Sequence, residues 1–211
     1  AQGPRVCVIG AGSSGIAVVK ALQDRGISQV CYEKSDDIGG NWCFRNRNGM
    51  SAAYESLHIN TDAKLMEYRD YPMPADTPDY PGHRVIKRYF DDYVEHFGLR
   101  EHIRFDTEVK RAHRRDDGRW EISLDSGATE LFDVLIVANG HHWDPRWPEP
   151  PYPGEFDGEQ LHSHSYLNPT DPVDFHGKRV LVVGMGNSAM DIACELSRPG
   201  IAERLYLSAR R

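Results

Sequence analysis

Apolar residues and glycines follow the same order near both ends of this chain. Near the beginning, an apolar run over 6–9 predicts a buried strand, a glycine-rich turn follows, and the stretch 16–22 has helical character. Towards the other end, apolar runs predict a strand over 179–183, a helix over 190–197 and a second strand over 204–207, again with glycines after the first strand. Each segment therefore predicts a strand, a tight turn and a helix in succession, as in α/β proteins.

Between these two segments the apolar pattern changes its period. A short run over 29–32 predicts another buried strand, and helical spacing over 86–97 predicts an amphipathic helix whose apolar side faces the core. Short alternating strands, separated by Asp-Asp-Gly and Asp-Ser-Gly turns, predict an antiparallel β-meander over 103–105, 107–113, 120–124 and 131–137. The final run, FDVLIVANG over 132–140, predicts a buried strand that returns in parallel to the first one.

The first glycine turn has the spacing G-x-G-x-x-G, formed by Gly10, Gly12 and Gly15. Gly10 permits a tight turn, Gly12 lets a pyrophosphate approach the backbone, and Gly15 lets the helix pack closely on the strand. The phosphates would then meet the free N–H groups and the dipole of the helix N-terminus. Glu33 directly follows the run 29–32 and lies 18 residues after Gly15. A ribose-binding acid is expected roughly 20 residues after the glycine motif. The alternative is a glycine turn that holds no ligand.

The second glycine turn repeats this spacing with Gly184, Gly186 and Ala189, a small residue that the motif accepts at its third position. The strand that follows leads to Arg210 and Arg211 instead of an acid. Cations at this point suit a ribose 2′-phosphate, so this half-site is predicted to prefer NADP over NAD. The alternative is that both arginines form a solvated end.

Composition narrows the class of protein. With 39% hydrophobic and 27% charged residues, the 211 residues are predicted to form a packed core and a soluble surface. A net charge of −7 argues against a nucleic-acid partner, which needs clustered Lys and Arg. The four cysteines form no CxxC pair, so a reduced, cytoplasmic protein is predicted. No apolar stretch reaches the roughly 20 residues that span a bilayer, so no membrane partner is predicted.

Histidines occur in two close pairs, His141 with His142 and His162 with His164. Neither pair is accompanied by the further Cys, His or carboxylate ligands, at motif spacing, that a zinc site requires. The sequence therefore predicts no metal site.

The second histidine pair lies inside a longer pattern, F-x-G-x-x-x-H-x-x-x-Y, formed by Phe156, Gly158, His162 and Tyr166. With this pattern between two glycine turns, the chain resembles the flavin-containing monooxygenases, a family of class B flavoprotein monooxygenases, over 6–211. Tyr166 stands where Baeyer–Villiger relatives usually carry Trp, which favours oxygenation of a heteroatom. Family members continue beyond the second half-site, so the resemblance implies an N-terminal portion. The C-terminal portion would be supplied by another chain, or it would be absent because this chain is a fragment or a reduced derivative. Apolar surface exposed by its absence could be covered in a homo-oligomer.

The resemblance also implies a division of the chain. A Rossmann-type FAD-binding domain of the α/β class, with the inserted antiparallel β-meander, is implied over 1–144. A linker with the motif is implied over 145–177, and the start of a second Rossmann-type domain, which binds NADPH, over 178–211. The implied cofactors are FAD and NADP(H).

By the same resemblance, individual site residues can be named. Asn60, in the segment LHINT over 57–61, matches the family's asparagine at the flavin edge and is predicted to be catalytic, since an amide donates and accepts hydrogen bonds without titrating. The alternative is that Asn60 caps a turn. The implied FAD-binding residues are Gly10, Ala11, Gly12, Ser13, Ser14, Gly15, Glu33, Gly40, Asn41, Trp42, His58, Ile59, Asn60, Thr61, Ala138 and Gly140. The implied NADP-binding residues are Gly184, Gly186, Asn187, Ser188, Ala189, Asp191 and Arg210.

The resemblance implies one reaction sequence. NADPH reduces FAD, O₂ adds at flavin C4a, bound NADP⁺ protects the C4a-hydroperoxyflavin, and a small-molecule amine or sulfide takes the distal oxygen. The protein would supply orientation and a dry site, because the cofactor carries the difficult step. Two alternatives stay open: an NAD(P)H:flavin oxidoreductase or oxidase without substrate oxygenation, and a non-catalytic FAD-binding module.

Overall fold

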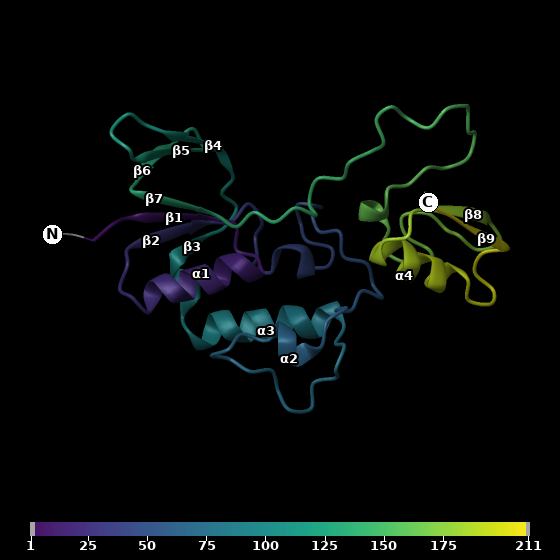
Figure 1. Ribbon diagram of the computed structural model, residues 1–211, viewed down its shortest axis with the longest axis horizontal. Coiled ribbons are helices and arrows are strands. Elements are labelled where there is room, and N and C mark those ends of the chain that lie inside the picture. Colours follow the sequence, from purple (N-terminus) through teal and green to yellow (C-terminus); the bar gives the residue numbers. More distant parts are fainter. Residues whose placement is uncertain (1–2, 210–211) are drawn as a thin grey trace.

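A parallel sheet of four strands forms the centre of the N-terminal part of the protein (Figure 1). In this computed structural model, which describes residues 3–209, the strands follow the order β3-β2-β1-β7. They are β1 (Val6–Ile9), β2 (Gln29–Tyr32), β3 (Ile103–Arg104) and β7 (Val134–Val137). The strands predicted over 6–9 and 29–32 are confirmed, and β7 returns in parallel beside β1 as predicted, with Val6 opposite Val134.

Both faces of this sheet are covered by other elements. Side chains alternate between the two faces along each strand, so neighbouring residues belong to different core clusters. Val6 and Val8 belong to the core cluster that lies under α1 (Ser13–Gln23) and α3 (His83–His96). Cys7, between them, belongs to a second cluster shared with an antiparallel sheet. Figure 1 shows the two helices on one side of the central sheet and the antiparallel strands on the other.

The antiparallel sheet has the order β4-β5-β6 and forms the predicted meander. Its strands are β4 (Val109–Arg114), β5 (Trp120–Leu124) and β6 (Thr129–Phe132). The prediction is wrong for 103–105, because β3 pairs in parallel with β2 and belongs to the central sheet. Ile103 is buried under the helices, and so short a strand has no period that distinguishes the two sheets. The predicted strand 131–137 divides at Asp133 into β6 and β7.

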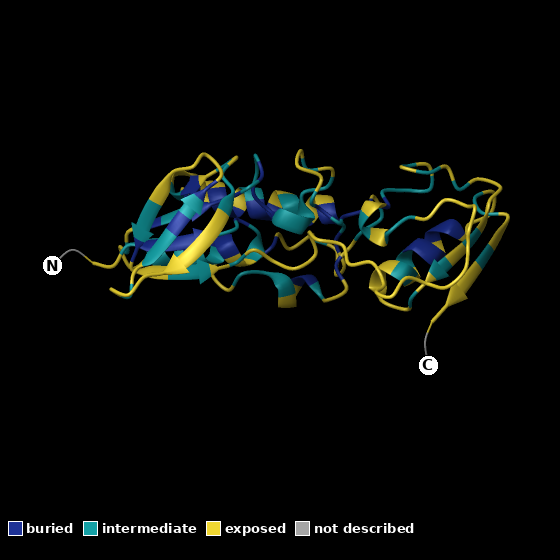
Figure 2. Ribbon diagram, turned by 90° about the horizontal axis from the view of Figure 1, so that it is seen from above, coloured by how far each residue is buried: buried dark blue, intermediate teal, exposed yellow. Residues whose placement is uncertain are grey.

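A second, smaller unit contains the other end of the chain. Its elements are β8 (Arg179–Val183), β9 (Arg204–Ser208) and α4 (Asn187–Leu196), and the two strands pair in parallel. Val180 and Val182 belong to a core cluster with α4, whereas Leu181, between them, is 59% exposed. Figure 2 shows the exposed strands beside the buried face of α4. The strands predicted over 179–183 and 204–207 are confirmed, and α4 begins earlier than predicted, directly after the glycine turn.

The remaining elements are short. They are η1 (Gly40–Trp42), α2 (Ala63–Met66), η2 (Leu99–His102) and η3 (Ser163–Ser165). From 138 to 162 the chain forms neither helix nor strand, and Figure 1 shows most of this stretch as a long excursion between the two units. Within 3–209, no helix has both the length and the apolar character needed to cross a membrane.

Glu130 on β6 ties the antiparallel sheet to the central one. Its carboxylate accepts hydrogen bonds from the Tyr32 hydroxyl (2.8 Å) and the guanidinium groups of Arg104 (2.6 Å) and Arg5 (2.5 Å). Burial raises the pKa of Glu130, but these donors outweigh it and leave the pKa below its ordinary value of 4.5. Because the folded pKa lies below the unfolded one, the stabilisation is complete above about pH 4.5 and is lost as the pH falls through the folded pKa.

Glu130→Gln is expected to lower the free energy of unfolding by about 1–2 kcal/mol at neutral pH, since three donors lose a charged acceptor at a partly exposed site. Urea unfolding at neutral pH and at about pH 3 measures the effect, and the difference from wild type should shrink at the lower pH. Glu121→Gln, which removes one exposed pair with Arg115, is the control and should change stability by less than about 0.5 kcal/mol. Equal effects of the two substitutions would contradict this role of Glu130.

Candidate functional site

The first glycine turn joins β1 to α1 and is fixed by close backbone contacts. Gly10 has a φ of +95°, and a Cβ there would lie 2.6 Å from the carbonyl oxygen of Ala138 at the end of β7. A Cβ on Gly15 would lie only 1.8 Å from the carbonyl oxygen of Gly10. α1 therefore approaches β1 and the end of β7 more closely than a side chain at either glycine would allow, as the motif requires.

The N-terminus of α1 is capped by a glycine. Gly12 occupies the N-cap position and offers no side-chain acceptor, so the first-turn N–H groups have no partner of that kind. Gly12 faces Gly40, whose added Cβ would lie 3.3 Å from the Gly12 Cα. Two backbones without side chains thus line a cradle beside the helix N-terminus, and a Cβ would begin to fill it. Free N–H groups and the helix dipole favour negative charge at such a helix N-terminus, which is the chemistry that a pyrophosphate requires.

Glu33 follows β2 and reaches back to the same turn. It is 9% exposed, and its two carboxylate oxygens accept the N–H groups of Ala11 (2.7 Å) and Ser35 (2.8 Å). Each oxygen retains a further lone pair, so the carboxylate can also accept a ribose hydroxyl. The structure brings Glu33 to the glycine turn, where a ribose-binding acid is needed.

Ser13 and Ser14 lie in the first turn of α1 and line a cavity of about 320 Å³. The other walls of this cavity come from Ala17, Met66, Tyr68 and Phe90. The Tyr68 hydroxyl donates to the carbonyl oxygen of Ser13 at 2.5 Å, which joins the segment after α2 to the turn. The sequence gives no signal for Met66 or Tyr68 as neighbours of the turn, because their segment has neither helical nor strand period.

Asn41 in η1 anchors the segment that leads to Asn60. The Asn41 side-chain oxygen accepts the N–H of Ala52 (2.8 Å), and the Asn41 carbonyl oxygen accepts the Ser51 hydroxyl (2.7 Å). The beginning of segment 51–61 is thereby attached to η1, whose first residue, Gly40, lies beside Gly12 at the cradle.

The four predicted site residues at 58–61, near the end of this segment, differ in their exposure to solvent. Ile59 is buried, whereas His58, Asn60 and Thr61 are exposed. The side chain of Asp62, the residue before α2, caps that helix. Asn60 is therefore presented at the surface between a buried neighbour and a helix cap.

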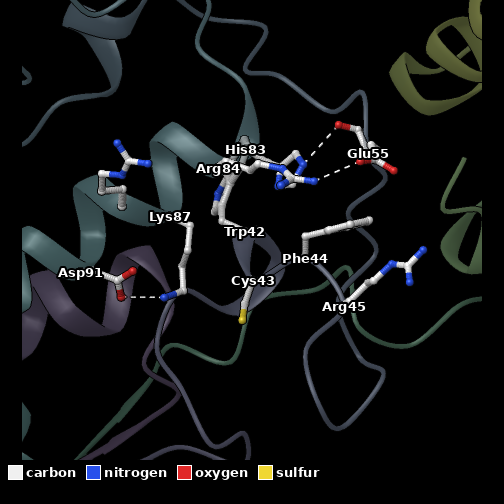
Figure 3. Close-up of a pocket in the computed structure, with 10 residues that line it drawn as sticks. Trp42, Cys43, Phe44, Arg45, Glu55, His83, Arg84, Lys87 and Asp91 are labelled. Carbon is white, nitrogen blue, oxygen red and sulfur yellow. Dashed lines mark hydrogen bonds and ion pairs between the residues drawn. The ribbon is translucent and has the colours of Figure 1, made fainter.

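Trp42 lines a larger cavity of about 670 Å³ between η1 and α3 (Figure 3). Two of its cations are already paired, Lys87 with Asp91 at 2.6 Å and Arg84 with Glu55 at 3.0 Å. Neither glycine turn contributes to its lining. This cavity is therefore separate from the cradle.

The second glycine turn joins β8 to α4. Gly184 has a φ of +129°, and Gly186 caps α4 without a side-chain acceptor. A Cβ on Gly184 would lie 3.6 Å from the Cβ of Ala189, which is an ordinary contact. This turn is less crowded than the first one, and it accommodates alanine at the third position of the motif.

Three predicted residues near the turns lie at the surface. Asn187 and Ser188 in the first turn of α4 are exposed, and Gly140, with a φ of +67°, follows β7 in exposed chain. Arg210, the predicted partner of a 2′-phosphate, lies outside the described residues. The preference for NADP over NAD therefore stays a prediction.

Asp191, predicted to contact NADP, is hydrogen-bonded to the segment that contains Tyr54. Its carboxylate accepts the hydroxyl of Tyr54 at 2.5 Å. One turn further along α4, the buried Glu195 accepts the hydroxyls of Tyr166 (2.7 Å) and Ser56 (3.1 Å). Neither Tyr54 nor Glu195 stands out in the sequence, because their contacts join segments that are far apart along the chain.

The F-x-G-x-x-x-H-x-x-x-Y pattern is spread along the chain before β8. Phe156 is 68% exposed, whereas Tyr166 is 1% exposed. His162 precedes η3, where its Nδ1 accepts the N–H of His164 at 3.1 Å. Tyr166 is the member of the pattern whose side chain the structure connects to α4.

Two strand–turn–helix units, one with Glu33 beside its turn, define an α/β protein of the Rossmann type with two units suited to nucleotides. The chain belongs to the flavin-binding monooxygenase-like family, whose model matches residues 3–211. The family predicted from the sequence is confirmed, and its cofactors are FAD and NADP(H).

Curated relatives are similar along almost the whole chain. Flavin-containing monooxygenase 5 of Rattus norvegicus is 38% identical over 218 residues, which cover 98% of this chain and 40% of that protein. Dimethylaniline monooxygenase (N-oxide-forming) 2 of Mus musculus is 38% identical over 217 residues, with the same coverage of both chains. The chain thus spans about 40% of the length of these relatives.

Solved structures share the predicted fold. S-allyl-L-cysteine S-oxygenase from Allium sativum gives a TM-score of 0.86 at 28% identity, covering 98% of this chain and 51% of that one. A complex of OTEMO with FAD and NADP gives 0.75 at 26% identity, covering 98% and 39%. The open form of cyclohexanone monooxygenase gives 0.74 at 27% identity, covering 100% and 40%. The Rossmann-type fold with an inserted antiparallel sheet is confirmed.

Proposed function

We propose that this chain carries the FAD and NADPH half-sites of a monooxygenase that uses NADPH and O₂ to oxygenate soft nitrogen or sulfur nucleophiles. The observation that carries the proposal is the pair of glycine turns, at 10–15 and 184–189, in one chain of the flavin-binding monooxygenase-like family. The chemistry that FAD supplies when bound is two-electron redox and activation of O₂. The protein supplies binding, orientation and exclusion of water.

The FAD half-site is proposed at the cradle between Gly12 and Gly40. The N-terminus of α1 would bind the pyrophosphate through backbone N–H groups. Glu33 would accept hydroxyls of the adenosine ribose while it keeps its bond from Ala11. The fit rests on the open cap of α1, the missing side chains of the cradle and the carboxylate beside it.

The NADP half-site is proposed at the corresponding turn between β8 and α4. Gly186 leaves the first turn of α4 without a side-chain acceptor, and the exposed hydroxyl of Ser188 can donate to a phosphate. The end of β9 adjoins this turn, since the Gly184 N–H donates to the carbonyl oxygen of Ser208 at 2.8 Å. Arg210 is proposed as the partner of the 2′-phosphate from the sequence motif alone.

A soft heteroatom is proposed as the group that receives oxygen. Two of the similar proteins are named for such reactions, the N-oxide-forming dimethylaniline monooxygenase and the S-allyl-L-cysteine S-oxygenase. In the structural comparison the S-oxygenase has the higher TM-score, 0.86 against 0.74 for cyclohexanone monooxygenase, at nearly equal identities of 28% and 27%. Tyr166 at the end of the sequence pattern supports the same choice.

Asn60→Ala is expected to reduce NADPH-dependent sulfoxidation about 100-fold or more while FAD stays bound. The exposed Asn60 amide is proposed to hydrogen-bond at the flavin edge, and the loss of such a donor in the transition state has an effect of this size. Steady-state sulfoxidation by FAD-loaded protein measures it. Lys64→Ala, on the exposed face of the adjacent α2, is the control and should leave the rate unchanged. If sulfoxidation survives unchanged in Asn60→Ala, Asn60 is not the catalytic amide.

A further inference from the structure

We propose that Tyr54, Tyr166 and Glu195 are positioning residues that hold helix α4 at a fixed place against the segment 51–57. Their hydrogen bonds, from Tyr54 to Asp191 and from Tyr166 and Ser56 to Glu195, are named the α4 latch. The inference rests on the proposed function, because the distance that the latch would control is the one between the FAD and NADP half-sites.

Both acceptors of the latch lie on one face of α4. Asp191 and Glu195 are four residues apart, so their carboxylates follow one another along the same side of the helix. Asp191 accepts the Tyr54 hydroxyl at 2.5 Å, and Glu195 accepts the hydroxyls of Tyr166 at 2.7 Å and Ser56 at 3.1 Å. All three donors come from outside the helix, two of them from a segment more than 100 residues earlier in the chain.

Burial makes these bonds strong determinants of position. Glu195 is 7% exposed, and a buried carboxylate without donors is costly, so the helix is favoured only where its donors are in place. Burial, followed by the hydrogen bonds to the carboxylates, raises the pKa of both Tyr54 and Tyr166, so both phenols remain donors at physiological pH. Hydrogen bonds from a hydroxyl to a carboxylate are about twice as strong as neutral ones.

Apolar contacts surround the same bonds. Tyr54 and Tyr166 share a core cluster with Ile192 and Leu196 of α4, and the two tyrosine rings meet edge to face at 6.3 Å. The N–H of Glu55 donates to a carbonyl oxygen in the chain just after Tyr166 at 2.8 Å. The middle and end of α4 are therefore held, whereas Asn187 and Ser188 in its first turn are exposed.

The other end of the latch leads to the proposed FAD half-site. Ser51 and Ala52, just before Tyr54, are hydrogen-bonded to Asn41. Asn41 follows Gly40, one wall of the cradle. A short path of bonds therefore joins the cradle to the helix whose first turn is the proposed NADP half-site. Misplacement of reacting groups by about 1 Å can slow a reaction 100-fold, so loosening this path should slow the reduction of bound FAD by NADPH.

The test measures anaerobic reduction of bound FAD in Tyr54→Phe and Glu195→Gln by rapid mixing with NADPH. Both substitutions keep the shape of the side chain and remove or weaken latch bonds. We expect the limiting rate of reduction to fall about tenfold to 100-fold, with the FAD spectrum and the affinity for NADP⁺ nearly unchanged. Tyr32→Phe is the matched control, since it removes a tyrosine–carboxylate bond, to Glu130 at 2.8 Å, within the first unit, and its rate should equal that of wild type.

Amide hydrogen exchange provides a readout that does not require activity. Exchange in 51–57 and in the last two turns of α4 should become faster in Tyr54→Phe and Glu195→Gln but not in Tyr32→Phe. If the wild-type protein does not reduce its bound FAD with NADPH, the proposed function fails. The latch is then tested by amide hydrogen exchange alone. Wild-type reduction rates in both latch variants, or unchanged exchange in 51–57 and α4, would overturn the latch.

Discussion

Gly15→Ala is expected to prevent retention of FAD and to lower the free energy of unfolding by about 3 kcal/mol or more. A Cβ at this position would lie 1.8 Å from the carbonyl oxygen of Gly10, and that oxygen belongs to backbone, which cannot rotate away. Overpacking typically costs about 1–3 kcal/mol, and this contact falls at the upper end because neither partner is flexible. Relief requires α1 to move away from β1, and that movement would open the cradle at the helix N-terminus.

Urea unfolding and the ratio of FAD to protein absorbance after gel filtration measure the two effects. Gly3→Ala is the matched control, since an added Cβ there would have nothing within 4 Å. Both quantities should be those of wild type in the control. Full occupancy by FAD together with an unchanged unfolding midpoint in Gly15→Ala would contradict the close packing of the first glycine turn.

Glu33→Ala is expected to weaken FAD binding roughly tenfold to 100-fold. The substitution removes a charged acceptor for the ribose, and hydrogen bonds to charged groups contribute about 1.5–3 kcal/mol. It also leaves the buried N–H groups of Ala11 and Ser35 without their acceptor, so the free energy of unfolding should fall by about 1–3 kcal/mol. Fluorescence titration of apoprotein with FAD measures the affinity, and urea unfolding measures the stability.

Glu108→Ala provides the comparison for this prediction. Glu108 is also an ion-paired carboxylate, with Lys34 at 3.1 Å and Lys110 at 2.6 Å, but it lies at the surface. Its removal should leave the affinity for FAD as in wild type. A dissociation constant in Glu33→Ala equal to that of Glu108→Ala would exclude Glu33 as the ribose acid.

Local features were predictable wherever a single short segment decides them. The strand over 6–9, its glycine turn and the strand over 179–183 follow from an apolar run next to a glycine motif, and the structure has each in place. The position of Glu33 beside the first turn follows from the same motif, because the order of strand, helix and strand returns the end of β2 to the end of β1.

Features that depend on pairing between distant segments were not predictable from local pattern. The local pattern predicts the strand over 103–105 in the wrong sheet, because only its pairing with β2 distinguishes the two sheets. The hydrogen bond from Tyr54 to Asp191 joins residues far apart in the sequence, and nothing in the local pattern around Tyr54 indicates a contact with α4. Glu195 is buried although it is a charged residue in a short helix, since Tyr166 and Ser56 supply the hydroxyls that its carboxylate needs, and the local pattern indicates neither of them as a neighbour.

The proposed function requires that one chain holds both FAD and NADPH so that NADPH can reduce FAD. The most direct measurement is the absorption spectrum of the FAD-loaded protein, followed by anaerobic addition of NADPH and then by air with a sulfide present. We expect a yellow protein that NADPH bleaches and that regains its colour in air, with the sulfide converted to its sulfoxide. A protein that stays colourless after addition of FAD, or a yellow one that NADPH does not bleach, would contradict the proposed function.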